Sequence, residues 1–357
     1  MALSPMHSVL TAGKGHEMLK TAIKRHLQGV LASLAPGVLR IRRGQLLVLM
    51  YHRILPPGDE RLGTEQPGMV VHPETLGMQL RVIKKYFEIV HLDEWLDRTK
   101  RGQPVPARSC VLTFDDGWLD NYEYAYPILV REQAPATIFV VSDLVGSNQT
   151  FWPEQLATLL RRGMAQHGRK LFNHPAWTWL QDVNISLPQS INELSLDCID
   201  RIISAAKQYP DSALLEKMDD MKAALTTDAY RQDLALMNWS QLREMSESGL
   251  VTVGSHTRRH TRLLPGITTE ILQDEIAVSK SNIEKEMGRP VRLFCYPNGD
   301  ASPDAIAMVK KHYLGACSTL HGWCRPNDDR HMIRRIGIHQ DIAFDETSFL
   351  ARLTGWI

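Results

Sequence analysis

The sequence predicts an α/β protein with a mainly parallel sheet, arranged as a barrel or a distorted barrel. Two observations lead to this class. Short segments that are apolar throughout alternate with longer segments whose apolar residues recur at helical spacing. Continuous apolar strands are typical of parallel sheets covered on both faces. Regular alternation of such strands with helices favours a parallel architecture, and this many units suit a barrel.

The expected elements follow one another along most of the chain. The strands are expected at residues 46–51, 110–114, 136–141, 250–254, 291–295 and 313–317. The helices are expected at residues 76–87, 93–101, 121–132, 239–248, 269–287 and 303–312. In this architecture functional residues gather at the carboxyl ends of the strands. Candidate site residues are therefore those that directly follow each strand.

The composition excludes several classes of protein. The chain has 357 residues, with 41 Lys and Arg against 40 Asp and Glu, and 43% of its residues are hydrophobic. A net charge of +1 gives no general electrostatic reason to expect a nucleic-acid partner. The hydrophobic content does not suit a disordered chain. Five scattered cysteines, an odd number, do not suit a disulfide scaffold, so we expect a reducing, cytoplasmic location.

The N-terminal region predicts an amphipathic helix. Residues 1–15 lack the basic start and unbroken apolar run of a secretory signal. Residues 16–34 carry apolar side chains at helical spacing with basic residues between them. Because Arg40, Arg42 and Arg43 follow, two interpretations stay open: a helix that lies on the domain, which we favour, or a peripheral contact with the inner membrane. No stretch reaches the roughly 18 apolar residues of a spanning helix.

One long segment interrupts the alternation of strands and helices. Residues 143–238 are mostly helical in pattern and too long for a simple loop, with helices expected at 152–162, 191–207 and 213–225. A lid or substrate-binding subdomain and a structural cap are equally open interpretations. The expected domains are therefore a helical segment at 1–44, a main domain at 45–345 interrupted by this insertion, and a C-terminal tail at 346–357.

Two adjacent aspartates begin the candidate chemistry. Asp115, Asp116 and Gly117 directly follow the strand expected at 110–114. Two carboxylates that leave a buried strand can divide one site between a metal ligand and a proton acceptor, and the glycine lets the backbone turn. A surface turn would use the same residue types, so the motif alone does not decide.

A histidine pair supplies the second motif. His256 and His260 follow the strand expected at 250–254, and a spacing of four places two imidazoles on one side of a helical turn. The motif of zincin proteases is excluded, because Thr257 stands where that motif requires Glu. Together with Asp116, the pair offers one carboxylate and two imidazoles to a metal and leaves positions open for water and substrate.

The third motif is a turn after the strand expected at 291–295. Tyr296, Pro297, Asn298 and Gly299 predict a rigid turn whose backbone N–H groups can face a developing oxyanion. Alone it is an ordinary end of a strand.

The three motifs in this order resemble the polysaccharide deacetylase family with the NodB homology domain, which is carbohydrate esterase family 4-like. The resemblance covers about residues 45–345 apart from the insertion, and three ordered motifs make coincidence improbable. Residues 48–52, Val-Leu-Met-Tyr-His, also resemble the first strand of bacterial members that serve exopolysaccharide and envelope synthesis. The resemblance implies a distorted (β/α) barrel and metal-dependent removal of acetyl from an N-acetylated sugar.

The resemblance also implies roles for single residues. Asp115 would be the general base, and Asp116, His256 and His260 would be the metal ligands. The turn formed by Tyr296, Pro297 and Asn298 would face the oxyanion. Zinc is the expected metal, although cobalt, nickel, iron and manganese suit the same ligands.

Further candidates come from departures from the family pattern and from residues near the motifs. His339 is the candidate general acid, and His52 is its rival because it too follows an apolar strand. Many relatives carry Arg at the position of Cys295, so we expect Arg335, or less readily Arg334, to orient Asp115 instead, and Cys295 to be a buried apolar residue. Trp118 is the aromatic residue that we expect to stack on a sugar ring.

The expected function is a metal-dependent N-deacetylase that acts on an amino sugar of a bacterial envelope polysaccharide, an exopolysaccharide or a glycolipid precursor. Two alternatives stay open. The same site could act on another amide, such as an N-formyl sugar, since a fold does not determine a substrate. The chain could instead be a non-catalytic sugar-binding protein. The oligomeric state is open.

Overall fold

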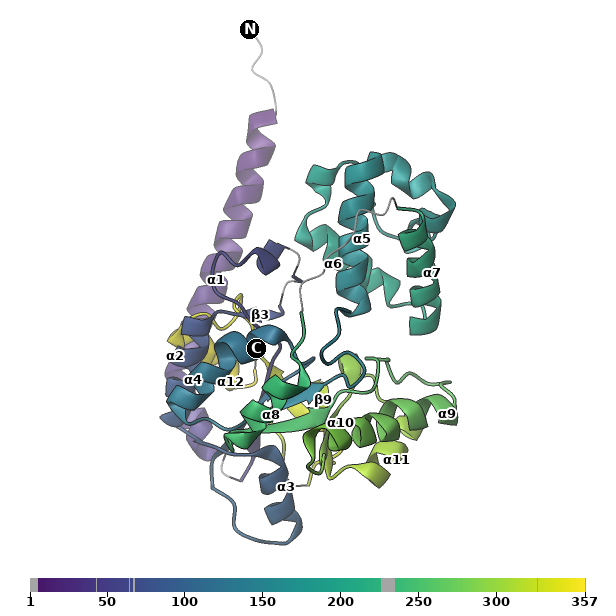
Figure 1. Cartoon of the computed structure of the whole chain (residues 1–357). Coiled ribbons are helices and arrows are strands. Elements are labelled where there is room, and N and C mark those ends of the chain that lie inside the picture. The colour runs from purple at the N-terminus through teal and green to yellow at the C-terminus, as the bar shows by residue number, and fades with distance from the viewer. Residues whose placement is uncertain are drawn as a thin grey trace.

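The computed structural model describes residues 6–42, 44–63, 65–66, 68–225, 235–325 and 327–356. For residues 6–22 and 24 the description covers the backbone alone. Figure 1 shows a barrel with helices around it, a separate group of helices beside one end of the barrel, and a long N-terminal helix along one side.

The centre of the molecule is a closed ring of seven parallel strands. The strands of the ring are β1(Leu46–Tyr51), β5(Ser109–Phe114), β6(Ala136–Val140), β7(Val251–Ser255), β8(Leu293–Cys295), β9(Gly315–His321) and β10(Ile333–Gly337). Strand β1 pairs with both β5 and β10, which closes the ring. A short strand, β4(Glu88–Ile89), pairs with the start of β5, and β2(Arg53–Ile54) pairs with β3(Val70–Val71) outside the ring. The predicted α/β barrel is confirmed.

Strand β10 is the ring strand that the apolar pattern did not predict, although the family resemblance implies a late strand that carries Arg335. Its sequence, Ile-Arg-Arg-Ile-Gly, lacks a continuous apolar run, so it gives no signal of a strand buried on both faces. The strand lies in the ring, and Arg335 is buried there: its guanidinium donates to the Ser318 carbonyl oxygen of β9 and to Asp115, which directly follows β5.

Helices cover the outside of the ring, largely where the sequence predicts them. They are α2(Pro73–Lys84), α3(Leu92–Lys100), α4(Tyr126–Glu132), α8(Trp239–Glu247), α9(Thr269–Leu272), α10(Ser279–Met287) and α11(Pro303–His312). Two segments predicted as plain helices contain π-helical turns, at Asn121–Ala125 and at Gln273–Val278. Strands β5 and β6 are buried along their whole length, as continuous apolar strands require.

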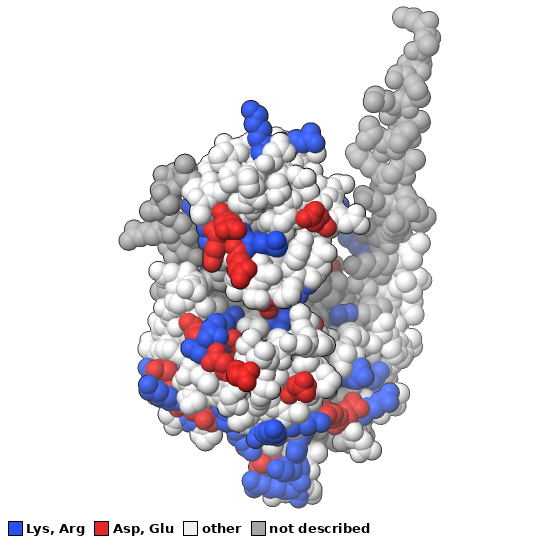
Figure 2. Space-filling view, turned by 90° about the vertical axis from the view of Figure 1, so that its right-hand side faces the viewer, with Lys and Arg blue, Asp and Glu red and all other residues white. Residues whose placement is uncertain are grey.

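The insertion between β6 and α8 is helical, as predicted. It contains α5(Trp152–His167), α6(Leu196–Ala206) and α7(Asp211–Ala223), and the segment between α5 and α6 contains 3₁₀ turns. It has its own hydrophobic core, in which Trp177, Leu160 and Ile202 are fully buried. In Figure 2 the insertion stands above the barrel, and Lys and Arg side chains lie beside Asp and Glu side chains over this face. Such mixed charge offers a polyanion no broad basic surface on this face.

The N-terminal and the C-terminal helix pack against each other beside the barrel. Helix α1(Met6–Ile41) packs against α12(Glu346–Leu353) through buried side chains that include Ala35 and Leu39. The prediction of a C-terminal tail at 346–357 is wrong for residues 346–353. Asp345 and Ser348 form a capping box that starts α12, and Phe349 is fully buried in the core.

Over residues 23–34, the side of α1 away from this contact carries apolar side chains. Ile23, Leu27, Val30 and Leu34 follow one line along the helix and are about half exposed. Arg43, one of the basic residues cited above, lies outside the described residues. Among the described helices, none combines the length and the apolar character needed to cross a bilayer.

Candidate active site

The barrel brings the three motifs to one end of the ring. Tyr51 of β1 pairs with Phe114 of β5, so the residues that follow them, His52 and Asp115, leave the sheet at the same level. The same holds on the other side of β5, where the paired strands β6, β7 and β8 carry the histidine loop and the Tyr296 turn. The carboxyl ends of these strands therefore form one site.

Asp116, His256 and His260 form a compact group of metal-ligand type. The Oδ1 atom of Asp116 lies 3.4 Å from the Nε2 atom of each imidazole. His256 donates from Nδ1 to the carbonyl oxygen of Cys295 at 2.8 Å, which turns the lone pair of Nε2 toward Asp116. Trp118 donates from its indole N–H to the Oδ2 atom of Asp116 at 3.0 Å. This set of one oxygen and two oriented nitrogens fits a divalent metal with open positions.

The backbone of these ligands is unusual. Asp116, Thr257 and His260 have φ angles of 76°, 66° and 65°, in the left-handed region that non-glycine residues seldom adopt. The prediction that His256 and His260 share a helical turn is wrong, because positive φ angles at Thr257 and His260 break any helical course. The two imidazoles still converge, with ring centroids 4.9 Å apart.

Asp115 lies beside the ligand group and is bound by Arg335. The guanidinium donates to Oδ1 at 2.8 Å and to Oδ2 at 2.7 Å, and both side chains are buried. Burial raises the pKa of Asp115, but the charge and the hydrogen bonds of Arg335 outweigh this effect, so the pKa lies below its ordinary value. Asp115 is therefore ionised near neutral pH and can accept a proton.

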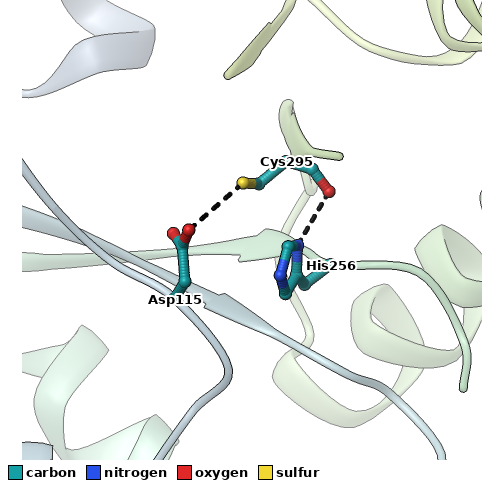
Figure 3. A group of neighbouring side chains, drawn as sticks. All are labelled: Asp115, His256 and Cys295. Carbon is teal, nitrogen blue, oxygen red and sulfur yellow. Dashed lines mark hydrogen bonds between the residues drawn. The ribbon is translucent and has the colours of Figure 1, made fainter. Parts of the chain in front are cut away.

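A second possible ligand group overlaps with the first. Asp115, His256 and Cys295 also lie close together, and Figure 3 shows the Cys295 thiol directed at Asp115 and its carbonyl at His256. Arg335 already binds both oxygens of Asp115 and lies 3.1 Å from the sulfur. Burial raises the pKa of the Cys295 thiol, which disfavours the thiolate that a metal requires. The group around Asp116 fits a metal better.

The two candidate acids occupy different surroundings. The Nε2 atom of His52 lies 3.9 Å from the Oδ2 atom of Asp115. Burial lowers the pKa of His52, and the charges of Asp115 and Asp116 oppose this effect without reversing it. The Nδ1 atom of His339 lies instead 3.3 Å from Asp341. The structure thus brings the rival candidate, rather than the first one, next to the expected base.

Trp118 does not offer a face to a sugar. Its side chain is 1% exposed, because the guanidinium of Arg53 lies 4.1 Å from the ring centroid and Phe151 packs edge-on at 5.1 Å. The expectation that Trp118 stacks on substrate is therefore wrong. Its observed contact is the hydrogen bond to Asp116, so it orients that carboxylate.

In the turn after β8, fewer residues can offer a backbone N–H to an oxyanion than the sequence predicted. The Tyr296 N–H donates to the Cys317 carbonyl oxygen at 3.1 Å, and its ring is buried against Phe294. Pro297 has no N–H to donate. Asn298, whose φ angle is 53° and whose side chain is exposed, is the member of the turn left to face a substrate.

Two neighbours of the site were missed by sequence reasoning. Phe151, from the insertion, packs on the ring of His260 with centroids 4.6 Å apart. Cys295 was expected to act only as an apolar side chain, but its sulfur lies 3.5 Å from the Oδ2 atom of Asp115. Nothing in the sequence near Phe151 signals the first contact. The position of Cys295, where relatives carry Arg, could have signalled the second.

Comparison with known proteins identifies the family. The sequence profile described as polysaccharide deacetylase matches residues 102–210 and 212–316. YxkH of Bacillus subtilis (strain 168), whose name also describes a polysaccharide deacetylase, is 34% identical over an alignment 127 residues long, which covers 31% of this chain and 44% of that protein. The match thus spans less than half of the curated relative.

Solved structures share the fold at low sequence identity. The deacetylase PplD of Streptococcus pyogenes, in complex with acetate, is 17% identical with a TM-score of 0.55, and the match covers 87% of this chain and 99% of that one. IcaB of Ammonifex degensii is 18% identical with a TM-score of 0.53, over 87% and 97% of the two chains. These likenesses support the fold, and the profile match over more than half of the sequence establishes that the chain belongs to the polysaccharide deacetylase family.

Proposed function

We propose that the protein is a metal-dependent N-deacetylase acting on an amino sugar of a bacterial envelope polysaccharide, an exopolysaccharide or a glycolipid precursor. The observation that carries this proposal is that a proton acceptor and a group of metal-ligand type lie side by side in one site. A buried, ionised Asp115 lies beside the ligand group of Asp116, His256 and His260. Hydrolysis of an amide needs both a proton acceptor and a means of polarising the acyl group.

Each residue of the site has a proposed task. A divalent metal held by Asp116, His256 and His260 would lower the pKa of water and polarise the acyl oxygen. Asp115 takes the proton of the attacking water, and Arg335 keeps its carboxylate ionised and oriented. The Asn298 N–H faces the developing oxyanion.

The departing amine also needs a proton, and we propose His52 as its donor. Its Nε2 atom lies 3.9 Å from Asp115, so His52 and Asp115 can act on the same substrate amide. The Nδ1 atom of His339 lies 3.3 Å from Asp341, whereas His52 lies beside the proposed base.

Support for the substrate class comes from similar structures. IcaB shares this fold. A de-N-acetylase of Aggregatibacter actinomycetemcomitans shares it too, at 17% identity and a TM-score of 0.53, over 86% of this chain and 99% of that one. The bound acetate in the PplD structure is the product that deacetylation would release. Zinc is the proposed metal, because one carboxylate and two imidazoles with open positions suit a hydrolytic zinc site.

The test is acetate release from an N-acetylglucosamine oligomer and from a lipid-linked N-acetyl sugar. We expect zinc-dependent release by the wild type, and loss of release in Asp115→Asn and His256→Ala. Asp219→Asn, on the exposed side of the insertion, is the control and should release acetate at the wild-type rate. If the protein binds one metal ion per chain but releases formate and no acetate from matched sugars, the acyl group that it removes is formyl rather than acetyl. Metal and sugar binding without any turnover would point to a sugar-binding protein.

We further propose a cytoplasmic protein that touches the inner membrane through α1. The half-exposed line of Ile23, Leu27, Val30 and Leu34 supports this, since such a face can enter the boundary between headgroups and acyl chains. Co-sedimentation with vesicles of phosphatidylglycerol and phosphatidylethanolamine tests it. Binding by the wild type that is lost in Leu27→Ser/Leu34→Ser supports the contact, and equal binding by the two proteins contradicts it.

A further inference from the structure

The loop that carries the two histidine ligands has a backbone that needs outside support. Thr257 and His260 have positive φ angles although neither is glycine. Such conformations are unfavourable by themselves and persist where surrounding contacts hold them. The contacts that stabilise this loop therefore help to determine where the two histidine ligands lie.

A buried arginine ties the loop to the helical insertion. Arg262 lies two residues after His260 and is 4% exposed. Its Nε and its backbone N–H donate to the two carboxylate oxygens of Asp211, each at 2.7 Å. Its terminal nitrogens donate to the carbonyl oxygens of Lys207 and Tyr209 at 2.8 and 2.5 Å. All of these acceptors belong to the insertion: Lys207 and Tyr209 lie in the turn between α6 and α7, and Asp211 is the first residue of α7.

An aromatic side chain of the insertion touches the ligand group from a second direction. Phe151 is 4% exposed and directly precedes α5. Its ring lies 4.6 Å from the ring of His260 and 5.1 Å from the ring of Trp118, which in turn donates to Asp116. One side chain of the insertion thus contacts both a ligand, His260, and Trp118, the residue that donates a hydrogen bond to the ligand Asp116.

The segments that lead into and out of the insertion bind the same loops by their backbones. Four hydrogen bonds do this: Ser142 N–H to Thr257 O, Asp143 N–H to Arg258 O, Met237 N–H to Gly117 O, and Leu119 N–H to Ala235 O, with lengths of 2.9 to 3.2 Å. The first two hold the segment between the histidines, and the other two hold the segment after Asp116. The insertion is therefore attached at each loop that supplies a ligand.

We infer that the helical insertion supports the metal site, and that Asp211 and Arg262 are positioning residues that hold His260 in its ligand geometry. This inference rests on the proposed function in that it takes Asp116, His256 and His260 as the ligands. It gives the insertion a role other than that of a lid, because a lid would not need hydrogen bonds to both of the loops that supply the ligands. Residues around metal ligands commonly tune affinity without touching the metal.

The test compares Asp211→Ala with Asp219→Ala in the full chain. Both substitutions remove an aspartate of α7, but Asp219 pairs with the exposed Lys222 and not with a ligand loop. Two quantities are measured: the zinc affinity of the metal-free protein against a chromophoric chelator, and hydrogen exchange of residues 256–262 without metal. We expect Asp211→Ala to weaken zinc binding by about tenfold or more and to speed exchange of this segment. Asp219→Ala should change neither.

The outcomes separate this inference from the proposed function. Unchanged zinc affinity and unchanged exchange in a folded Asp211→Ala overturn the inference and leave the function intact. A wild type that binds no zinc overturns the proposed function, while exchange of residues 256–262 still decides whether Asp211 orders the loop. If Asp211→Ala does not fold, Asp211→Asn keeps the volume and one acceptor oxygen. It should then show smaller changes in the same direction, and an Asp211→Asn protein equal to wild type in both measurements contradicts the inference.

Discussion

Arg335 and Asp115 form a buried pair in which one guanidinium binds both oxygens of one carboxylate, at 2.8 and 2.7 Å. The two residues are separated by 220 positions and come from β10 and β5, on either side of β1. The pair is also tied to its surroundings, since Arg335 donates from Nε to the Ser318 carbonyl oxygen at 2.8 Å. The orientation of the proposed base is thus determined by a strand that carries none of the three motifs.

Arg335→Lys should therefore affect catalysis more than folding. Lysine keeps the charge but lacks the planar fork, so Asp115 would lose one of its two fixed hydrogen bonds. We expect kcat to fall by about 10²-fold, in the range found for mispositioned catalytic groups. The hydrogen bonds and charge of Arg335 lower the pKa of Asp115, and activity requires ionised Asp115, so the acidic limb of the pH–rate profile should move to higher pH.

Arg335→Met is the matched variant for stability. It leaves a buried carboxylate without its partner, which costs about 3–5 kcal/mol of unfolding free energy. Urea unfolding of the two variants and the wild type at pH 7 measures this difference. A pH–rate profile of Arg335→Lys that coincides with that of the wild type would contradict the role of Arg335 in orienting and ionising Asp115.

The choice between two histidines can be decided by a pair of identical substitutions. His52→Gln should lower kcat by about 10²- to 10⁴-fold, the usual contribution of a positioned acid, because the amine would depart without a proton. His339→Gln should leave kcat within about twofold, since its observed partner is Asp341 rather than Asp115. Zinc content measured on both variants is the control. Loss of turnover in His339→Gln with normal zinc content would reverse the assignment.

Trp118 offers a test of positioning against substrate binding. Trp118→Phe keeps an aromatic ring but removes the N–H that donates to Asp116. We expect zinc affinity to fall by about tenfold, as for other residues that orient a metal ligand, and KM for the sugar to stay near its wild-type value. Titration of the metal-free variant with zinc, followed by kinetics at saturating zinc, separates the two effects. A higher KM at unchanged zinc affinity would restore the idea of a stacking residue.

The sequence predicted the fold because its signals are local. Strand β1 has the predicted bounds, since the run at 46–51 is apolar throughout and bounded by polar residues. Helix α11 also has the predicted bounds, because Ser302 caps its start, Pro303 occupies its first turn and basic residues fill its last turn. The helices of the insertion could also be predicted, because their signals are local. Each of these signals lies within a few residues of the element that it predicts.

The errors arise where distant residues decide. From its place beside a turn, Trp118 was predicted to stack on a sugar. Arg53 and Phe151, which are distant from it in the chain, instead bury its ring. The histidine spacing predicts a helical turn, but Thr257 has a positive φ angle, and its carbonyl oxygen accepts hydrogen bonds from the Ser142 N–H and from the Ser279 hydroxyl, both distant in the chain. Strand β10 lacks an apolar run, so the resemblance implied its Arg335 and the pairing of this residue with Asp115, whereas the local pattern did not. The site residues themselves could be predicted as a set, whereas their orientation depends on tertiary contacts.

A buried carboxyl group of the insertion lies near the site without a defined role. Glu154 belongs to the first turn of α5, and its Oε2 atom is buried without a hydrogen-bond partner among the described residues. Its Oε1 atom accepts a long hydrogen bond of 3.4 Å from Gln66. Burial raises the pKa of Glu154 well above its ordinary value, and the nearby carboxyl groups of Glu65 and Asp116 act in the same direction while Arg53 opposes it.

This raised pKa predicts how stability depends on pH. Between the ordinary pKa of glutamate and the raised one, the folded protein keeps a proton that the unfolded chain releases, so stability falls as pH rises through this range. Glu154→Gln removes the effect, because the amide is neutral at every pH. We expect the unfolding free energy of the variant to exceed that of the wild type at pH 8, by about 1.4 kcal/mol for each unit by which folding raises the pKa of Glu154, and to be close to it at pH 4. Urea unfolding at both pH values, with the exposed Glu216→Gln as the control, measures this, and an equal difference at the two pH values would contradict a raised pKa of Glu154 as its cause.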